Sequence, residues 1–166
     1  EEAFYDVFTA INALADMYNV PIIYSCHPRA EKFIRERNFS FDERVRIHKP
    51  LGFHDYNQLQ IQALAVVSDS GTLPEEAAFF SSIDLGFPAV CIRTSTERPE
   101  AMEKGNFILA GIQKEEVLQA VALAIQLEKH HEKSLPVYDY IEPISGKVVR
   151  ILQSYTSIIN KTVWKK

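Results

Sequence analysis

Residues 65–80 read AVVSDSGTLPEEAAFF, and their pattern indicates a strand followed by a helix. The apolar run Ala65–Ser68 has the length and composition of a buried strand. Small and polar residues follow it, and a short helix is expected over Leu73–Phe80. The chain therefore passes from a strand through a tight turn directly into a helix, as it does in a strand–helix unit of a parallel sheet.

The same alternation continues on both sides of this stretch. Further strands are expected over 20–25, 45–48, 88–92 and 107–110, and further helices over 1–18, after Pro28, after an Asp55 N-cap, after Pro99, over 113–129 and over 145–163. Short apolar strands that alternate with helices predict the α/β class, a parallel sheet with helices on both faces. We expect one domain over residues 1–166.

Composition and charge bear on the partners. The chain has 166 residues, 46% of them hydrophobic, and a formal net charge of −4. A negative chain is not expected to bind nucleic acid or a membrane in general, so any anion needs a local site. Cys26 and Cys91 lie in apolar runs and are expected to be buried, reduced thiols in a cytoplasmic protein.

The first residues already follow a helical pattern. Apolar side chains recur with helical spacing from Phe4 to Tyr18, so the expected helix begins at the first residue. Natural chains rarely begin inside an element, and we therefore expect this chain to be a piece of a longer protein.

The segment 68–76 is the strongest site candidate. In a parallel sheet the ligand lies beyond the carboxyl ends of the strands, so polar residues just after a strand are favoured. The helix start offers unpaired N–H groups, Ser70 adds a hydroxyl, and Gly71 lets the backbone approach a ligand closely. This combination suits a diphosphate. Glu75 and Glu76 either contact ligand hydroxyls or compensate the helix dipole.

Three further candidates each have a structural alternative. The segment 93–100 (RTSTERPE) follows an expected strand and carries two arginines, three hydroxyls and two acids. Within it Arg98, at an expected helix start, either binds a phosphate through two parallel hydrogen bonds or forms a surface ion pair beside a capping box with Thr96 as N-cap. His27 follows the first strand and either donates to a ligand oxygen or is structural. Tyr56 and Phe53 follow the second strand and are available to stack on a flat ring, although Phe53 is equally well explained as a core residue.

These candidates suit one class of ligand. One sheet edge would gather a phosphate turn, an arginine, a histidine, a carboxylate and an aromatic ring, which suits a nucleotide diphosphate. The sequence contains no Walker A segment and no GxGxxG turn, which argues against a P-loop enzyme and a Rossmann dehydrogenase. It also contains no Cys/His spacing typical of a zinc site.

Two motifs then make a family recognisable. SDSGTLPEE (68–76) followed by FPAVCIRTSTERPEAMEKGNFILAGI (87–112) resembles the UDP-N-acetylglucosamine 2-epimerase family, which shows a DSGG-x-x-EE turn, a strand and then R-x-x-TERPEA. HPR (27–29) matches the family's mid-chain histidine. The similarity extends over nearly the whole chain. The polar linker and last helix look like the branch that forms UDP-N-acetyl-L-fucosamine.

The resemblance implies one half of a glycosyltransferase-B-like enzyme, which has two Rossmann-like domains and its site in the cleft between them. The resemblance implies that Ser70, Gly71 and Thr72 bind the diphosphate and that Glu76 binds the ribose. Uracil would lie between Tyr56 and the Leu51 backbone. Arg98 and His27 would lie on the phosphate side of the cleft. Two positions depart from the family pattern: Thr72 replaces the second glycine of DSGG, and Thr94 replaces the usual aspartate. Both departures fit the deoxysugar branch.

The family reaction inverts C2 of a UDP-2-acetamido sugar by eliminating UDP and adding it again, and the resemblance implies no cofactor and no metal. The proton-transferring carboxylates and a histidine-arginine-glutamate loop would lie upstream of Glu1. No catalytic residue is therefore expected in this half, and the chain alone is expected to be inactive. Its expected partners are the UDP-sugar and the N-terminal domain.

The last helix is expected to contact something other than its own domain. The resemblance implies that 145–166 crosses back to the N-terminal domain. Without that domain, its apolar stripe of Val149, Leu152, Tyr155 and Ile159 is expected to drive self-association, so a homo-oligomer is expected.

Two alternative functions are the donor-binding domain of a UDP-sugar glycosyltransferase and a non-catalytic UDP-sugar-binding domain.

Overall fold

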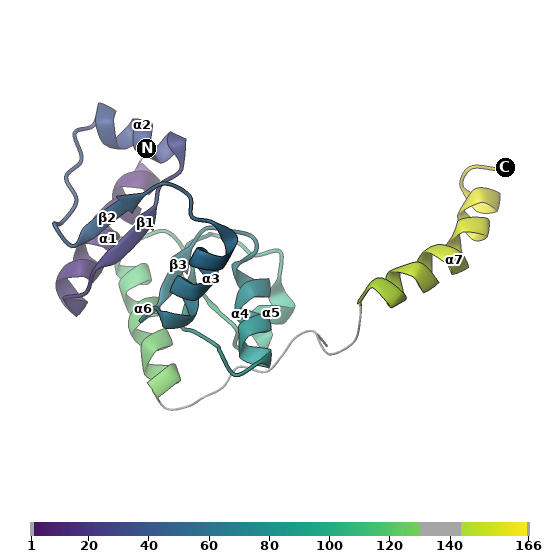
Figure 1. Cartoon of the computed structure of the whole chain (residues 1–166). Coiled ribbons are helices and arrows are strands. Elements are labelled where there is room, and N and C mark those ends of the chain that lie inside the picture. Colours follow the sequence, from purple (N-terminus) through teal and green to yellow (C-terminus); the bar gives the residue numbers. More distant parts are fainter. Residues whose placement is uncertain (1, 130–143, 166) are drawn as a thin grey trace.

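The computed structural model describes residues 2–129 and 144–165, and Figure 1 shows its elements. In chain order they are α1 (Glu2–Tyr18), β1 (Ile22–Ser25), α2 (Pro28–Glu36), β2 (Val45–His48), α3 (Phe53–Gln62), β3 (Val66–Ser68), α4 (Leu73–Ser82), β4 (Ala89–Cys91), α5 (Pro99–Glu103), β5 (Ile108–Leu109), α6 (Lys114–Lys129) and α7 (Ile144–Thr162). Each strand and helix predicted from the sequence is present, and the α/β class is confirmed.

The strands form two parallel sheets where the alternation predicts one. β1 pairs with β2, from Ile22 opposite Val45 along the two strands. In the second sheet β4 lies between β3 and β5, and both pairs are parallel. Ile22 of β1 and Val67 of β3 nevertheless pack against the same core, which is built on α1 and α6. Among the described strands, no hydrogen-bonded pair links the two sheets; they are joined by packing against this common core.

Alternate side chains of the second sheet enter two cores on its opposite faces. Val67, Val90 and Ile108 pack with the α1 and α6 side chains. Ala89 and Cys91 pack on the other side, with residues of α4 and α5. Because successive strand residues point to opposite faces, helices cover both faces of this sheet, as predicted.

An aromatic cluster covers one face of the first sheet. The ring of Phe8 in α1 is buried, and its centroid lies 5.2 Å from those of Phe39 and Phe41 and 6.1 Å from that of Tyr24 in β1. Tilted and edge-on aromatic pairs at such separations add to the stabilisation from burial. The other face is less covered among the described residues, since Ile23 is 49% exposed.

Both thiols are buried and free, as the sequence predicts. Cys26 lies in the aromatic core of the first sheet, and Cys91 lies in the core beneath α4 and α5. Burial is the main cause that raises the pKa of each thiol. A raised pKa keeps a thiol protonated and unreactive, so neither cysteine has the properties of a nucleophile.

The predicted start of α3 is wrong. The helix begins at Phe53 with Gly52 as its N-cap, so Asp55 lies in the first turn and does not cap it. Gly52 has the extended backbone of an N-cap, a position that glycine occupies well without a side-chain bond. Asp55 is still favourable inside the first turn, because a carboxylate there compensates the helix dipole.

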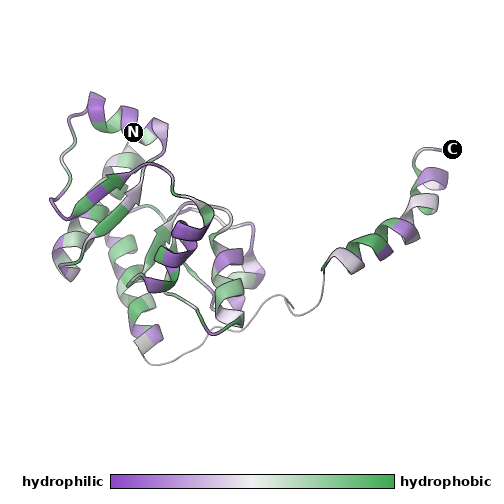
Figure 2. Cartoon of the chain, viewed as in Figure 1, coloured by the Kyte–Doolittle hydropathy of each residue, from purple (hydrophilic) through white to green (hydrophobic). Residues whose placement is uncertain are grey.

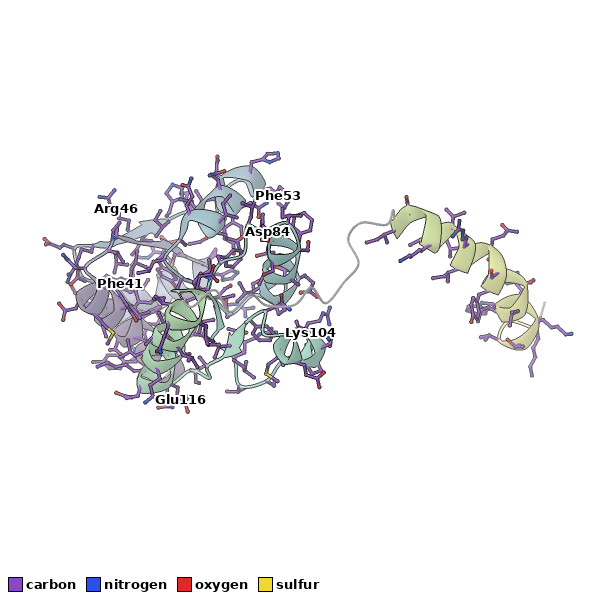
Figure 3. All side chains as sticks on the ribbon, turned by 90° about the horizontal axis from the view of Figure 1, so that it is seen from below. Phe41, Arg46, Phe53, Asp84, Lys104 and Glu116 are labelled. Carbon is purple, nitrogen blue, oxygen red and sulfur yellow. The ribbon has the colours of Figure 1, made fainter. Side chains whose placement is uncertain are left out.

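The helix predicted over 145–163 is confirmed as α7, which lies apart from the other elements in Figure 1. Figure 2 shows both hydrophobic and hydrophilic residues along it, and Figure 3 shows its side chains projecting without a neighbouring segment. None of its described residues is buried, and the stripe of Val149, Leu152, Tyr155 and Ile159 is exposed. Its crossing to another domain stays a prediction.

Candidate functional site

The turn between β3 and α4 is held by its own hydroxyl groups. The backbone N–H of Ser70 donates to Ser68 Oγ at 3.0 Å, and the N–H of Thr72 donates to Ser70 Oγ at 3.2 Å. The hydroxyl oxygens of Ser70 and Thr72 are 2.9 Å apart. Gly71 is exposed between them. Small residues therefore form an ordered, open turn at the carboxyl end of β3, where the sequence places the diphosphate.

The carboxylate of Glu76 accepts a hydrogen bond at each oxygen. Thr72 Oγ1 donates to Oε1 at 2.7 Å, and Gln60 Nε2 donates to Oε2 at 2.7 Å. A hydroxyl carries one hydrogen, so a Thr72 that donates to Glu76 must accept from Ser70. One directional chain of hydrogen bonds therefore joins the β3–α4 turn to Glu76, and the buried Gln60 of α3 donates to the same carboxylate from the other side.

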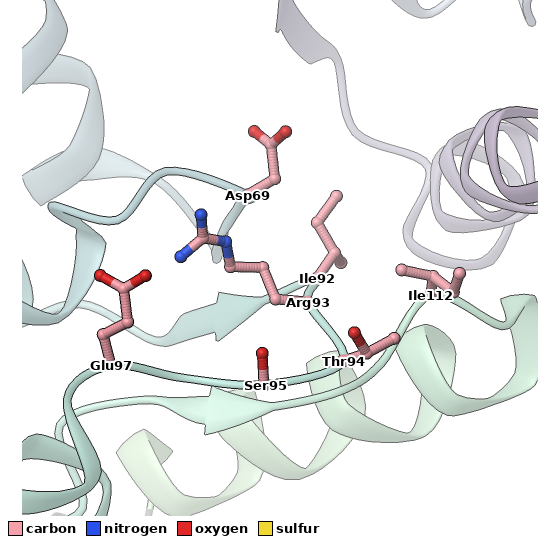
Figure 4. A pocket seen from close by; sticks show the side chains of 7 residues that line it. All are labelled: Asp69, Ile92, Arg93, Thr94, Ser95, Glu97 and Ile112. Atoms are coloured by element: carbon pink, nitrogen blue, oxygen red, sulfur yellow. The ribbon is translucent and has the colours of Figure 1, made fainter.

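An open pocket of about 400 Å³ lies beside this turn (Figure 4). It is lined by residues that follow β3, β4 and β5: Asp69, Ile92, Arg93, Thr94, Ser95, Glu97 and Ile112. The guanidinium of Arg93 points into the space between the side chains of Asp69 and Glu97. The pocket thus lies at the carboxyl ends of three parallel strands, where such sheets bind ligands.

Two arginines follow β4, and they have different surroundings. Arg93 lines the pocket. Arg98 forms an ion pair through Nε with Glu75 Oε1, and its Nη1 donates to the Glu97 carbonyl at 3.0 Å. The predicted ion pair at Arg98 is therefore confirmed, and its phosphate role stays a prediction. Arg93 belongs to the predicted candidate segment 93–100, but the phosphate role predicted for that segment falls on Arg98 and not on Arg93.

The predicted capping box at the start of α5 is wrong. The N-cap is Arg98 and the helix begins at Pro99. Thr96 Oγ1 instead accepts from the Arg98 N–H at 3.0 Å in the preceding turn. Proline suits the first helical position because its φ is already helical and its missing N–H is not needed there.

His27 is the N-cap of α2. Its Nδ1 accepts a hydrogen bond from the Arg29 N–H at 3.2 Å. A ring nitrogen that accepts carries no proton, so the neutral tautomer assigned by this bond has its hydrogen on Nε2. The ring is exposed just beyond β1. The structural role predicted for His27 is thus present, and an Nε2–H donor remains for the predicted ligand contact.

Aromatic residues of α3 lie at different depths. Burial raises the pKa of the half-buried Tyr56, and the negative charge of Glu76 raises it further. Leu51 is partly buried just before the helix. The Phe53 side chain is 75% exposed, and its ring lies edge-on to the ring of His54. Figure 3 shows it at the surface, so the alternative that Phe53 is a core residue is wrong.

Neither a metal centre nor a membrane-spanning helix is found in residues 2–129 and 144–165. In this part of the chain no three His, Cys, Asp or Glu side chains gather as a metal site would require. The helices found there are all too short or too polar to traverse a lipid bilayer.

Comparison with known proteins identifies the family. The sequence model of UDP-N-acetylglucosamine 2-epimerase matches residues 1–153. This chain belongs to the UDP-N-acetylglucosamine 2-epimerase family. It is 31% identical over 135 residues to the UDP-N-acetylglucosamine 2-epimerase of Methanocaldococcus jannaschii, a match that covers 78% of this chain and 35% of that protein. For the Bacillus subtilis epimerase the identity is 30% over 118 residues, covering 69% of this chain and 29% of that protein.

Solved epimerase structures agree with the fold. The structure from Rickettsia bellii gives a TM-score of 0.85 at 34% identity, covering 100% of this chain and 45% of that one. The Methanocaldococcus jannaschii epimerase in complex with UDP-GlcNAc and UDP gives 0.77 at 27% identity, covering 92% and 41%. The predicted fold class, a Rossmann-like unit of a glycosyltransferase-B-like epimerase, is confirmed. The chain spans less than half the length of these relatives.

Proposed function

We propose that this chain is the UDP-binding part of a UDP-N-acetylhexosamine 2-epimerase, an isomerase that inverts C2 of a UDP-2-acetamido sugar. The observation that carries the proposal is the β3–α4 turn, which is hydrogen-bonded to Glu76 and lies beside the Arg93 pocket. Its family membership and its likeness to an epimerase solved with UDP-GlcNAc and UDP support the choice of ligand.

The start of α4 and Arg93 favour a diphosphate electrostatically, whereas the carboxylates of Asp69 and Glu97 in the same pocket oppose it. A diphosphate at the turn lies at the start of α4, a helix of 10 residues whose N-terminal end carries partial positive charge. Arg93 adds a guanidinium, which can donate two parallel hydrogen bonds to phosphate oxygens. Gly71 has no side chain to obstruct the ligand, and the Ser70 hydroxyl would reach a phosphate oxygen by turning its hydrogen away from Thr72.

The proposed reaction explains why these groups matter for catalysis. When UDP is eliminated, the bond from the sugar C1 to the phosphate oxygen breaks and its electron pair stays on the diphosphate. The growing negative charge is stabilised by the helix start and by Arg93, which lowers the barrier. The C2 hydrogen is not acidic, and we assign its removal and return to carboxylates outside this chain.

The remaining proposed contacts concern the nucleoside. Glu76 would accept hydrogen bonds from the ribose hydroxyls, and Tyr56 would flank uracil with the Leu51 backbone. His27 and Arg98 would lie on the phosphate side.

The finer proposal concerns the sugar. We propose that the substrate is a 2-acetamido-2,6-dideoxy-L-talose nucleotide and the product UDP-N-acetyl-L-fucosamine, made for a surface polysaccharide. Thr94, which replaces the usual aspartate, lines the pocket, and Thr72, which replaces a glycine, bonds to Glu76. Both departures from the family pattern thus lie at the site. NMR of the longer protein incubated with this nucleotide and with UDP-GlcNAc tests the assignment, which predicts turnover of the former.

The partners are also proposed. The active enzyme would need a second domain, and the 166-residue chain alone would bind UDP without epimerising any UDP-sugar. The exposed stripe of α7 would support a homo-oligomer. Sedimentation of the chain at rising concentration is expected to show association, and a strict monomer would contradict it.

Calorimetry with UDP and NMR of a UDP-sugar mixture test the proposed function together. UDP binding without turnover by the chain is the expected result. Epimerisation by the chain alone would contradict the division of roles. Transfer of the sugar to an acceptor by the longer protein would instead favour a glycosyltransferase.

A further inference from the structure

We infer that Gln60 is a positioning residue that orients the Glu76 carboxylate to bind the two neighbouring hydroxyls of a ribose. The inference rests on the proposed function and deepens it, because it adds a residue that determines which nucleoside diphosphates the site accepts. Neither the sequence motifs nor the predicted contacts include Gln60.

The burial of Gln60 is not explained by packing alone. Its residue surface is 2% exposed, and its Oε1 is buried without a hydrogen-bond partner among the described residues. A buried amide oxygen without a partner destabilises a fold, so an apolar side chain of similar size would suit the position at least as well. The bond that Gln60 does make, from Nε2 to Glu76 Oε2 at 2.7 Å, therefore accounts for the amide.

The direction of this bond follows from the chemistry of the pair. An ionised carboxylate has no hydrogen to give, so the NH₂ end of the amide must face Glu76. Thr72 donates to the other oxygen, Oε1. The two donors come from different elements, α3 and the turn before α4. The carboxylate cannot rotate without weakening one of the two bonds, and its plane is therefore fixed.

The two bonds leave a specific pair of acceptor positions. A carboxylate has about four lone-pair positions, two on each oxygen. Gln60 and Thr72 each occupy one position on a different oxygen, so one position remains on each. Two adjacent hydroxyls of a ribose can each donate to one oxygen, whereas a 2′-deoxyribose can satisfy one oxygen and leaves the other without a donor.

The test compares affinities for UDP and 2′-deoxy-UDP, measured by calorimetry on the 166-residue chain and on Gln60→Leu. Leucine keeps the approximate volume and removes both the donor and the unpartnered oxygen. The matched control is Gln62→Leu, the same change at an exposed position of the same helix. Melting temperatures are recorded for each protein.

We expect the wild-type chain to bind UDP about tenfold or more tightly than 2′-deoxy-UDP, since a hydrogen bond to a charged group is lost with the hydroxyl. Gln60→Leu should reduce this preference to about threefold or less, with an unchanged or raised melting temperature, and Gln62→Leu should keep it. A merely structural role would lower the melting temperature of Gln60→Leu and leave the ratio of the two affinities unchanged.

Each other result has a distinct meaning. If Gln60→Leu keeps the wild-type preference for UDP over 2′-deoxy-UDP, the inference is overturned. The proposed function still stands in that case, because the wild-type chain binds UDP. A wild type that binds both nucleotides equally also overturns the inference. A wild type that binds neither contradicts the proposed function itself. If Gln60→Leu does not fold, Gln60→Met removes the same donor with an unbranched side chain. The ratio of its affinities for UDP and 2′-deoxy-UDP then tests the inference in the same way.

Discussion

The guanidinium of Arg93 lies beside Gly71, so that a Cβ on Gly71 would be 3.8 Å from Arg93 Nη1. This contact joins two segments that follow different strands, the turn after β3 and the loop after β4. It also brings the pocket of Figure 4 up to the turn that holds Ser70 and Thr72. An anion seated at the turn would therefore meet both the helix start and an arginine.

The Gly71 contact leads to the first prediction. A separation of 3.8 Å is ordinary van der Waals contact, so Gly71→Ala should change the free energy of unfolding by less than about 1 kcal/mol. The added methyl group would stand where a diphosphate approaches, and crowding of about 1–3 kcal/mol corresponds to a loss of UDP affinity of roughly 5- to 150-fold. Thermal unfolding and calorimetry measure the two effects. An unchanged UDP affinity would place the diphosphate elsewhere.

The second prediction concerns Arg93. Arg93→Lys keeps the positive charge and loses the planar fork, so UDP should bind about tenfold more weakly with little change in melting temperature. Arg46→Lys, on the exposed side of β2, is the matched control and should leave UDP affinity unchanged. Equal affinities for all three proteins would remove Arg93 from the site.

The third prediction separates two roles of Arg98. If Arg98 contacts phosphate as proposed, Arg98→Lys should weaken UDP binding by about tenfold, and Glu75→Gln should not weaken it, because the guanidinium stays available. If the ion pair with Glu75 is the whole role, both variants lose up to about 1 kcal/mol of stability, as partly exposed pairs do, and both keep their UDP affinity. Calorimetry on the two variants distinguishes these results.

Features coded by neighbouring residues could be predicted from the sequence. The α4 helix follows β3 after a few small residues, and Ser70, Gly71, Thr72 and Glu76 all lie within that short segment, so their clustering is local. The predicted start of α3 is wrong because the N-cap is Gly52, which has no side chain to signal the position, and not Asp55.

Features that depend on distant segments could not be predicted in the same way. Gln60 reads as one polar residue of an amphipathic helix, and its burial follows from the packing of α3, where Ile61 meets the core that contains Leu73 and Ala77 of α4. The importance of Arg93 over other polar residues after β4 depends on its closeness to Gly71, which belongs to a different loop. Neither relationship corresponds to a motif or a fixed spacing that could be recognised in the sequence.

The fourth prediction concerns acid stability. Arg44 donates through its backbone N–H and its guanidinium to Asp42, and these bonds lower the pKa of that carboxyl from its ordinary 3.8 to about 2. A lowered pKa in the folded state means that the stabilisation is complete above pH 3.8 and is lost as the pH falls towards 2.

Asp42→Asn should therefore lower the melting temperature at pH 7, and the gap from the wild type should close between pH 3.8 and 2. Thermal unfolding at a series of pH values measures this gap. The neighbouring and exposed Glu43→Gln is the control and should give no such pH-dependent gap. A constant gap for Asp42→Asn across the acid range would show that the charge of Asp42 contributes nothing.

The most direct test of UDP binding at the β3–α4 turn is a titration of the ¹⁵N-labelled chain with UDP, followed by amide chemical shifts. The largest shift changes should fall on residues 70–76 other than Pro74, which has no amide hydrogen, and on Arg93. Glu76→Gln should bind UDP about tenfold or more weakly, because a charged acceptor of the ribose hydroxyls is lost. Shift changes confined to other segments, or none at saturating UDP, would show that UDP does not bind at this turn.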